Sequence, residues 1–189
     1  MEETTTISFR ITRELRDSLR REAEKAGQTL NAFVISCFQK EVEWASATRG
    51  FEYAHLSSQI LLAFIKGVET EEIAKLGRQL LASRLRDLAS LIHGKADLNG
   101  FRQIVNLENK YQYTWDVAYS WKEENDQLRL FVRHGLSRKW SIFLGEGYLE
   151  YLRSIGINAS YEALNNSLKL IINPTSRTSQ PSSNKRSFR

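Results

Sequence analysis

The segment TTISFRIT (residues 5–12) is the feature that most constrains what this chain can fold into. Its apolar and polar residues alternate, with Ile7, Phe9 and Ile11 on one side and Thr6, Ser8 and Arg10 on the other. A period of two residues predicts a half-buried β-strand. The sequence that follows, from Arg13 to about Trp44, has helical periodicity and offers no second strand. Because a lone strand would leave its backbone donors and acceptors unpaired, the segment needs a pairing partner from elsewhere.

Two helices are predicted after this strand. Thr12 is the expected N-cap of the first helix, and Gly27 is a suitable stop for it. Thr29 is the expected N-cap of the second helix, which is apolar around more than half of its circumference and therefore has to be covered on several sides. About forty residues with so small a core are not expected to be stable as a monomer.

The order ISFRIT, RELRDSLRREAEKAG and QTLNAFVISCFQKEV, within about Thr4 to Trp44, resembles the ribbon-helix-helix DNA-binding domain of Arc/MetJ/CopG-type prokaryotic repressors. This resemblance covers roughly a fifth of the chain. It implies that the strand pairs antiparallel with the same strand of a second chain and that the two-stranded ribbon enters the major groove of double-stranded DNA. The side chains that it sends to base edges are Thr6, Ser8 and Arg10.

The expected phosphate contacts lie at the start of the second helix, where free backbone N–H groups attract anions. The residues of this corner are Gln28, Thr29, Leu30 and Asn31, and Arg13 is expected to add a contact to the DNA backbone. For the arginines of the first helix, a solvated face paired with Glu and Asp is an equally good interpretation. A further alternative is that the strand is an edge strand of a larger α/β domain.

Residues 1–45 are thus expected to form the DNA-binding and dimerisation domain, and residues 46–174 to form an α+β domain for oligomerisation or sensing. Helical spacing predicts helices over about 56–68 and 70–93, and HGKADLNG then breaks the pattern. Alternation from Tyr111 onward predicts a β-hairpin, followed by a helix from Ser137 to Gly156 and one or two strands. The expected order is α-α-β-β-α-β, with a small antiparallel sheet under a helix.

Residues that could take part in catalysis or in binding a metal or ligand are scattered along the sequence. The sequence has no P-loop, no dinucleotide-binding glycine pattern and no G-x-S-x-G motif. Metal-ligating types are far apart at Cys37, His55, His93 and His134, so we expect no metal, no cofactor and no enzymatic activity. The aromatic residues between 111 and 151 are expected to form a core and a dimer surface, although a flat aromatic sheet could also stack single-stranded bases. Residues 133–139 form a basic turn that could bind an anion.

Charge and composition bear on partners and compartment. Residues 1–45 hold seven basic and eight acidic residues, whereas residues 175–189 hold four basic residues and no acidic one, so most of the net charge of +5 lies at the end of the chain. This tail is expected to be disordered. One cysteine fits a reducing compartment, and the longest apolar runs are too short to cross a bilayer, so a cytoplasmic protein without membrane contact is predicted.

The expected function is that of a sequence-specific, homodimeric, DNA-binding transcriptional regulator, most simply a repressor, with pairs of dimers on adjacent half-sites. Two alternatives remain open. One is an antitoxin that represses its own operon while the rest of the chain neutralises a toxin. The other is a ligand-binding or enzymatic second domain that the first domain merely dimerises. Whether the second domain binds an effector or a protein partner is left open.

Overall fold

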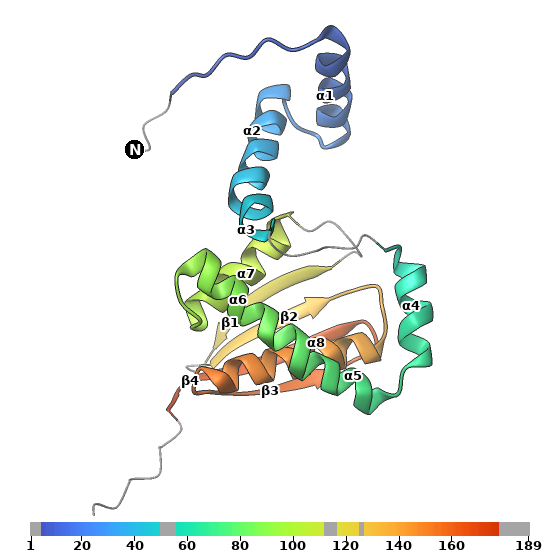
Figure 1. Ribbon diagram of the computed structural model, residues 1–189, viewed down its shortest axis with the longest axis vertical. Helices are drawn as coiled ribbons and strands as arrows, with labels where there is room; N and C mark the ends of the chain where they lie inside the picture. Colours follow the sequence, from blue (N-terminus) through green and yellow to red (C-terminus); the bar gives the residue numbers. More distant parts are fainter. Residues whose placement is uncertain (1–4, 50–55, 112–116, 125–126, 178–189) are drawn as a thin grey trace, which may run out of the picture. The chain divides into compact units, whose positions relative to one another are not determined.

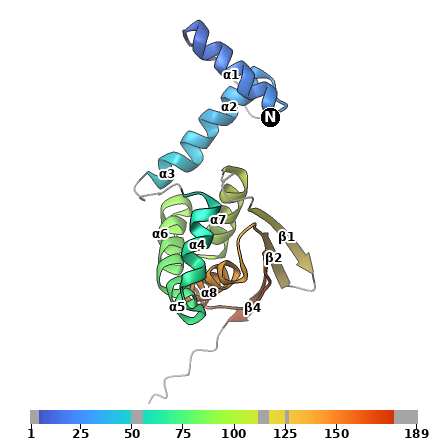
Figure 2. The same cartoon turned by 90° about the vertical axis from the view of Figure 1, so that its right-hand side faces the viewer.

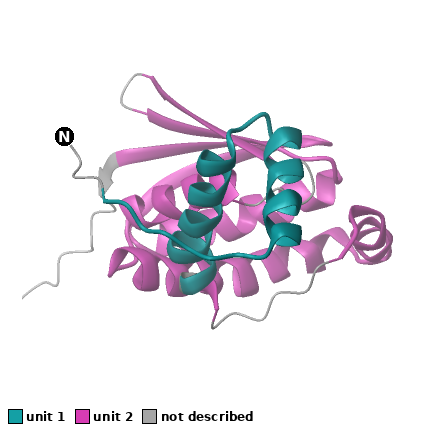
Figure 3. Cartoon of the chain, turned by 90° about the horizontal axis from the view of Figure 1, so that it is seen from above, with its two compact units in different colours: residues 1–46 teal, residues 47–189 magenta. Residues whose placement is uncertain are grey.

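The computed structural model describes residues 5–49, 56–111, 117–124 and 127–177. The chain divides into two compact units, residues 1–46 and 47–189 (Figure 3), next to the boundary predicted from the sequence. Together the units contain helices and one antiparallel sheet, so the α+β class is confirmed. His55 and two of the predicted aromatic residues, Tyr113 and Trp115, lie outside the described residues.

Unit 1 contains two helices joined by a tight turn (Figure 1). They are α1 (Arg13–Lys25) and α2 (Leu30–Lys40), and α2 continues into a π-helical turn, η1 (Glu41–Ala45), and the short α3 (Ser46–Thr48). Gly27 has a φ of 65°, and the Gln28 N–H donates to the Ala23 carbonyl at 2.9 Å, which closes the end of α1. Only glycine takes this left-handed conformation without strain, which explains why the helix stops there.

Unit 2 is built on a four-stranded antiparallel sheet in the order β1-β2-β4-β3. Two hairpins lie side by side, because the central strands β2 and β4 also pair with each other. The strands are β1 (Ala118–Glu124), β2 (Gln127–Arg133), β3 (Ile157–Ala163) and β4 (Ser167–Arg177). In register, Trp121 faces Leu130, Leu130 faces Leu170 and Leu170 faces Tyr161, which forms one apolar row across the sheet.

Helices lie on one side of this sheet (Figures 1 and 2). They are α4 (Ser58–Gly67), α5 (Thr70–Leu76), α6 (Ala82–His93), α7 (Leu98–Tyr111) and α8 (Arg138–Ser154), and the π-helical turn η2 (Gly77–Leu81) joins α5 to α6. Of these helices, α7 and α8 are the ones that pack directly on the strands. The buried core lies between these helices and the sheet, and Phe101 stands at its centre, in ring contact with Trp121, Tyr148 and Tyr151. Trp121, Tyr148 and Tyr151 belong to the predicted aromatic set, so the predicted core is confirmed for them, whereas the dimer surface stays a prediction.

Close packing of α8 depends on its glycines. A Cβ at Gly145 would lie 2.5 Å from the ring of Tyr161, and a Cβ at Gly147 would lie 2.6 Å from the side chain of Leu81. These distances are too short for real carbon contacts, so neither position tolerates a larger residue without movement of its neighbour. The two glycines thus set how closely α8 approaches β3 on one side and η2 on the other.

The structure corrects the predicted element order in three places. The predicted order omits α7, which Asp97 caps by accepting from the Gly100 N–H at 2.9 Å. Both strands after α8 form, as a hairpin, and β4 continues through Arg177, beyond the predicted domain end at 174. The helix predicted over 70–93 forms, but η2 interrupts its α-helical hydrogen bonding.

Candidate nucleic-acid interface

Residues 5–12 form no strand in the single chain, and the first regular element among the described residues is α1 (Figure 1). The strand was predicted to pair with the same strand of a second chain, so the single chain does not show the predicted ribbon. Its apolar side chains are not half-buried either, since Ile7 is 70% exposed, Phe9 64% and Ile11 48%. The physical reason is that a strand needs a neighbouring backbone, and the described part of one chain supplies none here.

The side chains that were predicted to read bases, those of Thr6, Ser8 and Arg10, are exposed. Phe9, from the apolar set, contacts the ring of Phe38 in α2, with ring centroids 5.6 Å apart. One member of the apolar set thus lies against α2 within the single chain.

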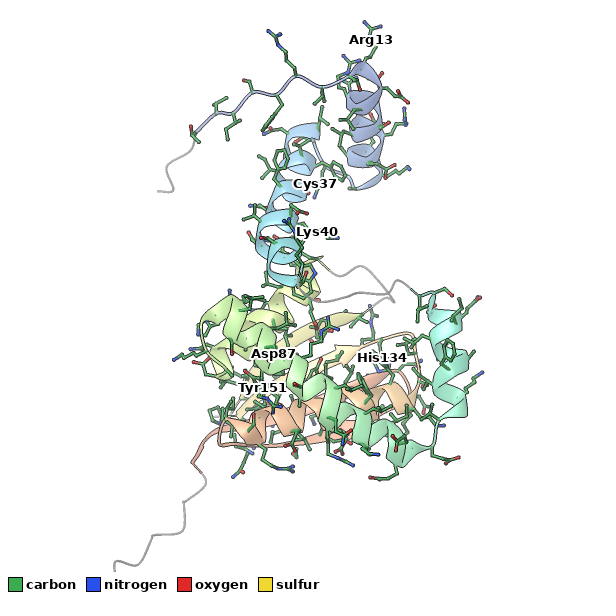
Figure 4. The ribbon with its side chains drawn as sticks, viewed as in Figure 1. Arg13, Cys37, Lys40, Asp87, His134 and Tyr151 are labelled. Carbon is green, nitrogen blue, oxygen red and sulfur yellow. The ribbon has the colours of Figure 1, made fainter. Side chains whose placement is uncertain are left out.

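The beginning of α1 follows the sequence prediction. The Thr12 hydroxyl accepts from the Leu15 N–H at 3.2 Å and caps the helix. Arg13 is exposed, and its side chain extends from the first turn of α1 (Figure 4). Arg16 instead forms an ion pair with Asp17 at 2.7 Å, which fits the solvated-face interpretation for that arginine.

The corner before α2 presents free donors to solvent. The Thr29 hydroxyl accepts from the Ala32 N–H at 3.2 Å, and Gln28, Thr29 and Asn31 are exposed while Leu30 is half-buried. Capping uses one of the four N–H groups that a helix start leaves without partners, so the others remain able to bind an anion. Arg13 lies at the opposite end of α1, about 20 Å away along a helix of this length, so one chain does not bring Arg13 to this corner.

Part of the apolar surface of α2 is exposed within the described part of unit 1. No residue of α2 is buried, and Ile35 and Phe38 are about half exposed, at 46% and 51%. Val42, in the η1 turn that continues α2, is 73% exposed. Cys37 is also exposed. Several exposed large apolar side chains on so short a unit are typical of a protein–protein interface.

Unit 2 changes the interpretation of the predicted basic turn. His134 is buried rather than on the surface (Figure 4), and burial lowers its pKa, so the imidazole is neutral near pH 7. Its Nδ1 accepts from the Leu136 N–H at 3.3 Å, so Nε2 carries the proton and donates to the Ser141 hydroxyl at 2.9 Å. Ser141 lies within 2.9 Å of the carbonyls of Leu164 and Ser167. Since Ser141 is fully buried, this histidine–serine pair fastens the β3–β4 turn and has no access to a substrate.

The ammonium group of Lys139 is also engaged within the protein and not in the predicted anion site. Its ammonium donates to the carbonyls of Lys66 at 3.1 Å and Val68 at 2.5 Å, which caps the carboxyl end of α4. His134 and Lys139 are therefore engaged within the fold, whereas Arg133 and Arg138 of the predicted basic turn are exposed.

Other titratable groups of unit 2 also contact one another within the fold. The Tyr119 hydroxyl donates to Glu108 at 3.0 Å, and desolvation raises the pKa of both groups. His93 lies 3.5 Å from Asp97 at the end of α6. Within the described ranges, no cluster of three or more His, Cys, Asp or Glu residues is arranged to hold a metal ion.

The sheet is not a stacking platform for bases. Tyr119, Trp121 and Tyr161 face the helices, and Phe131, at 38% exposed, is the large aromatic on the open face of the described strands. The stacking alternative needs several exposed rings, so it loses its main support.

Comparison with known proteins gives no assignment. No protein-family model matches the chain, and no curated protein matches it either. None of the described helices combines the length and apolar character that a membrane span requires.

Proposed function

We propose that this protein is a sequence-specific DNA-binding regulator that acts as a homodimer through a ribbon-helix-helix arrangement of unit 1. In this proposal residues 5–12 of two chains pair antiparallel, which supplies the backbone partner that each chain lacks. The same pairing places two copies of the apolar side, Ile7, Phe9 and Ile11, over the two α2 helices.

The observation that carries the proposal is the uncovered apolar surface shared by residues 5–12 and α2. Phe9, Phe38 and Val42 are each more than half exposed, yet Phe9 already contacts Phe38. Burying such side chains between two chains stabilises an assembly by roughly 25 cal/mol for each Å² of apolar surface removed from water. The helix pair, the Gly27 turn and the two threonine caps give the unit the element order that the resemblance requires, apart from the strand.

DNA recognition is assigned to the opposite side of the ribbon. There Arg10 can form two hydrogen bonds to a guanine edge, and Thr6 and Ser8 can donate or accept. The corner of Gln28–Asn31 would bind a phosphate through the free N–H groups of α2, and Arg13 would add a charge contact. Such contacts set the register on the duplex, whereas Arg10 sets the sequence preference.

The test is selection of bound fragments from random DNA, followed by footprinting at a stated salt concentration. We expect Arg10→Ala to lose about 1–3 kcal/mol of discrimination for each copy in contact with a base pair and to leave the dimer intact. Arg153→Ala is the matched control, because Arg153 lies in α8, where it pairs with Glu150 at 2.8 Å. A protected site that is identical for the wild-type protein and Arg10→Ala would contradict the assignment.

A further inference from the structure

The strand β3 lies at one edge of the four-stranded sheet, so one side of its backbone pairs with no other described strand (Figure 1). In an antiparallel pair, every second residue directs its N–H and C=O toward the neighbouring strand, and the residues between direct theirs away. The Leu164 N–H donates to the Ser167 carbonyl at 2.8 Å, so Leu164 is a residue of the first kind. Counted back from Leu164, Ala163, Tyr161 and Ala159 therefore direct their backbone groups outward.

This outer side of β3 is largely unpaired. The Nε of Arg138 donates to the Ala163 carbonyl at 3.4 Å, which agrees with the outward direction of Ala163 and covers that end of the strand. Among the described residues, the outward backbone groups of Ala159 and Tyr161 have no hydrogen-bond partner. An unpaired edge of this kind is a template for the addition of a further strand.

The opposite edge of the sheet is protected. In β1 the backbone N–H of Tyr119 donates to the side-chain carbonyl of Asn109, in α7, at 3.0 Å. The same strand ends in three consecutive charged residues, 122–124, and charges on an edge oppose the addition of another strand. In β3 the charged residue is Glu162, and the strand contains no proline. The structure thus leaves β3 more open to a partner than β1.

The helix side of this edge is open near both ends of β3. One hollow of about 610 Å³ lies between α5, α8 and the last residues of β3, where Tyr161 contributes to its lining. Another hollow of about 410 Å³ is lined by Ile155 and Ile157, at the beginning of the strand. A strand added beside β3 would therefore meet open space on that side.

The sequence of β3 is complementary to itself when a second copy runs antiparallel to it. With the two Ser160 residues opposite each other, Asn158 lies opposite Glu162 and Ala159 lies opposite Tyr161, in both halves of the pair. The carboxylate of Glu162 can accept from the amide of Asn158, and no like charges meet. The small side chain of Ala159 leaves room for the ring of Tyr161 on the face that carries the helices.

The backbone agrees with this register. Ala159 and Tyr161 have outward groups and lie opposite each other twice, so each of these two pairs can exchange both of its N–H···O bonds. Ser160, Asn158 and Glu162, all exposed, fall in the pairs without hydrogen bonds, whose side chains lie closer together. A shift by one residue would set outward groups opposite residues whose groups point inward. Registers centred on Tyr161 or Glu162 would place two rings or two carboxylates opposite each other.

We propose that two copies of unit 2 associate through β3, antiparallel and centred on Ser160, and so join their two sheets into one continuous sheet. The helices of both copies lie on the same side of this sheet, because the two Ser160 side chains share a face. The contact is separate from the proposed ribbon of unit 1 and does not rest on it, since every residue in it belongs to unit 2.

The test is disulfide cross-linking of the full chain. Cys37, the single cysteine, is replaced by Cys37→Ser, so that an introduced cysteine is the only thiol. Ser160→Cys then places two thiols in a pair whose Cα atoms are about 4.5 Å apart, a separation that a disulfide spans. Asn158→Cys is the matched control, because Asn158 is exposed on the same face of β3 but its two copies lie roughly 13 Å apart along the strand in this register.

Under oxidation by diamide we expect a covalent dimer from Ser160→Cys and about tenfold less from Asn158→Cys, whose thiols are too far apart. Co-expressed chains that carry Asn158→Cys and Glu162→Cys are expected to cross-link to each other, because these positions face each other. Equal yields from Ser160→Cys and Asn158→Cys would overturn the proposal, and so would a folded Ser160→Cys protein that forms no dimer. Circular dichroism checks folding; should Ser160→Cys fail to fold, absence of the mixed cross-link overturns the proposal instead.

A second variant tests the backbone pairing. Ala159→Pro removes an outward N–H and leaves the hydrogen bonds to β4 in place, and proline is accepted in edge strands at such positions. In the chain with Ser160→Cys, Ala159→Pro is expected to lower the yield of covalent dimer about tenfold, because the pair with Tyr161 loses a bond and the ring of proline blocks close approach. An unchanged yield would refute a contact made through the backbone of β3.

Discussion

Replacement of Phe38 by alanine tests the proposed dimer most directly. The Phe38 side chain is 51% exposed in the single chain, so about half of its surface is still to be buried when a second chain covers α2. Complete burial of a side chain of this size contributes roughly 1.5–3 kcal/mol, so the remaining half contributes about 0.75–1.5 kcal/mol. Because a symmetric dimer contains two copies, Phe38→Ala should cost the dimer about 1.5–3 kcal/mol, or roughly a tenfold to hundredfold increase in the dissociation constant.

The assay is sedimentation over a dilution series, with helix content followed by circular dichroism. Alanine favours helix more than phenylalanine does, so loss of α2 itself is not expected. Leu91→Ala is the matched control, since Leu91 is an apolar residue of α6 that is 58% exposed and takes no part in the proposed interface. A dissociation constant for Phe38→Ala within twofold of the wild-type value, or an equal effect of Leu91→Ala, would refute the placement of the interface. A wild-type protein that is monomeric at all concentrations would refute the ribbon itself.

Two further predictions concern unit 2. Gly145→Ala should destabilise the protein by about 1–3 kcal/mol, because the new methyl group would lie 2.5 Å from the Tyr161 ring, and chemical denaturation measures this loss. The pKa of His134 is lowered by burial, so its contribution to stability is complete above the ordinary histidine pKa and is lost as the pH falls through the lowered pKa of the folded state. The melting temperature should therefore fall on mild acidification, and His134→Gln, although less stable because of the lost bond to Ser141, should show a weaker decline; an identical slope for both proteins would contradict this cause.

Local signals in the sequence identified most of the helices. Thr12 and Thr29 cap α1 and α2 as predicted, Gly27 ends α1, and Gly156, which follows α8, has the φ of 76° that its predicted role as a stop requires. Each of these depends on one residue and its near neighbours. The signals for α7 were also present, because Asp97 is a good N-cap and the buried residues Phe101, Ile104 and Val105 recur at helical spacing. The glycine at position 100, inside the first turn, concealed this pattern.

Contacts that join distant segments could not be predicted in the same way. The partners of Arg78 include Glu146, 68 residues further along the chain, and no periodicity within η2 or α8 predicts this pairing. His134 resembles a solvated residue in a basic turn until the β3–β4 hairpin folds over it. Residues 5–12 are limited in the same way. Alternation predicts a strand, but it does not say with which backbone the strand pairs.

The π-helical turn η2 adds one residue to the helical segment formed by α5, η2 and α6, beyond what an ordinary α-helix with the same packing would need. Buried positions advance from Ile73 to Gly77 by four residues, then from Gly77 to Ala82 by five, and then from Ala82 to Leu85 by three. The step of five absorbs the surplus residue, so the segments on both sides keep the same face toward the core. A chain shortened by one residue within η2 would therefore retain its packing as an ordinary α-helix. A chain lengthened by one residue there would rotate α6 by about 100° and carry Leu85 out of the core.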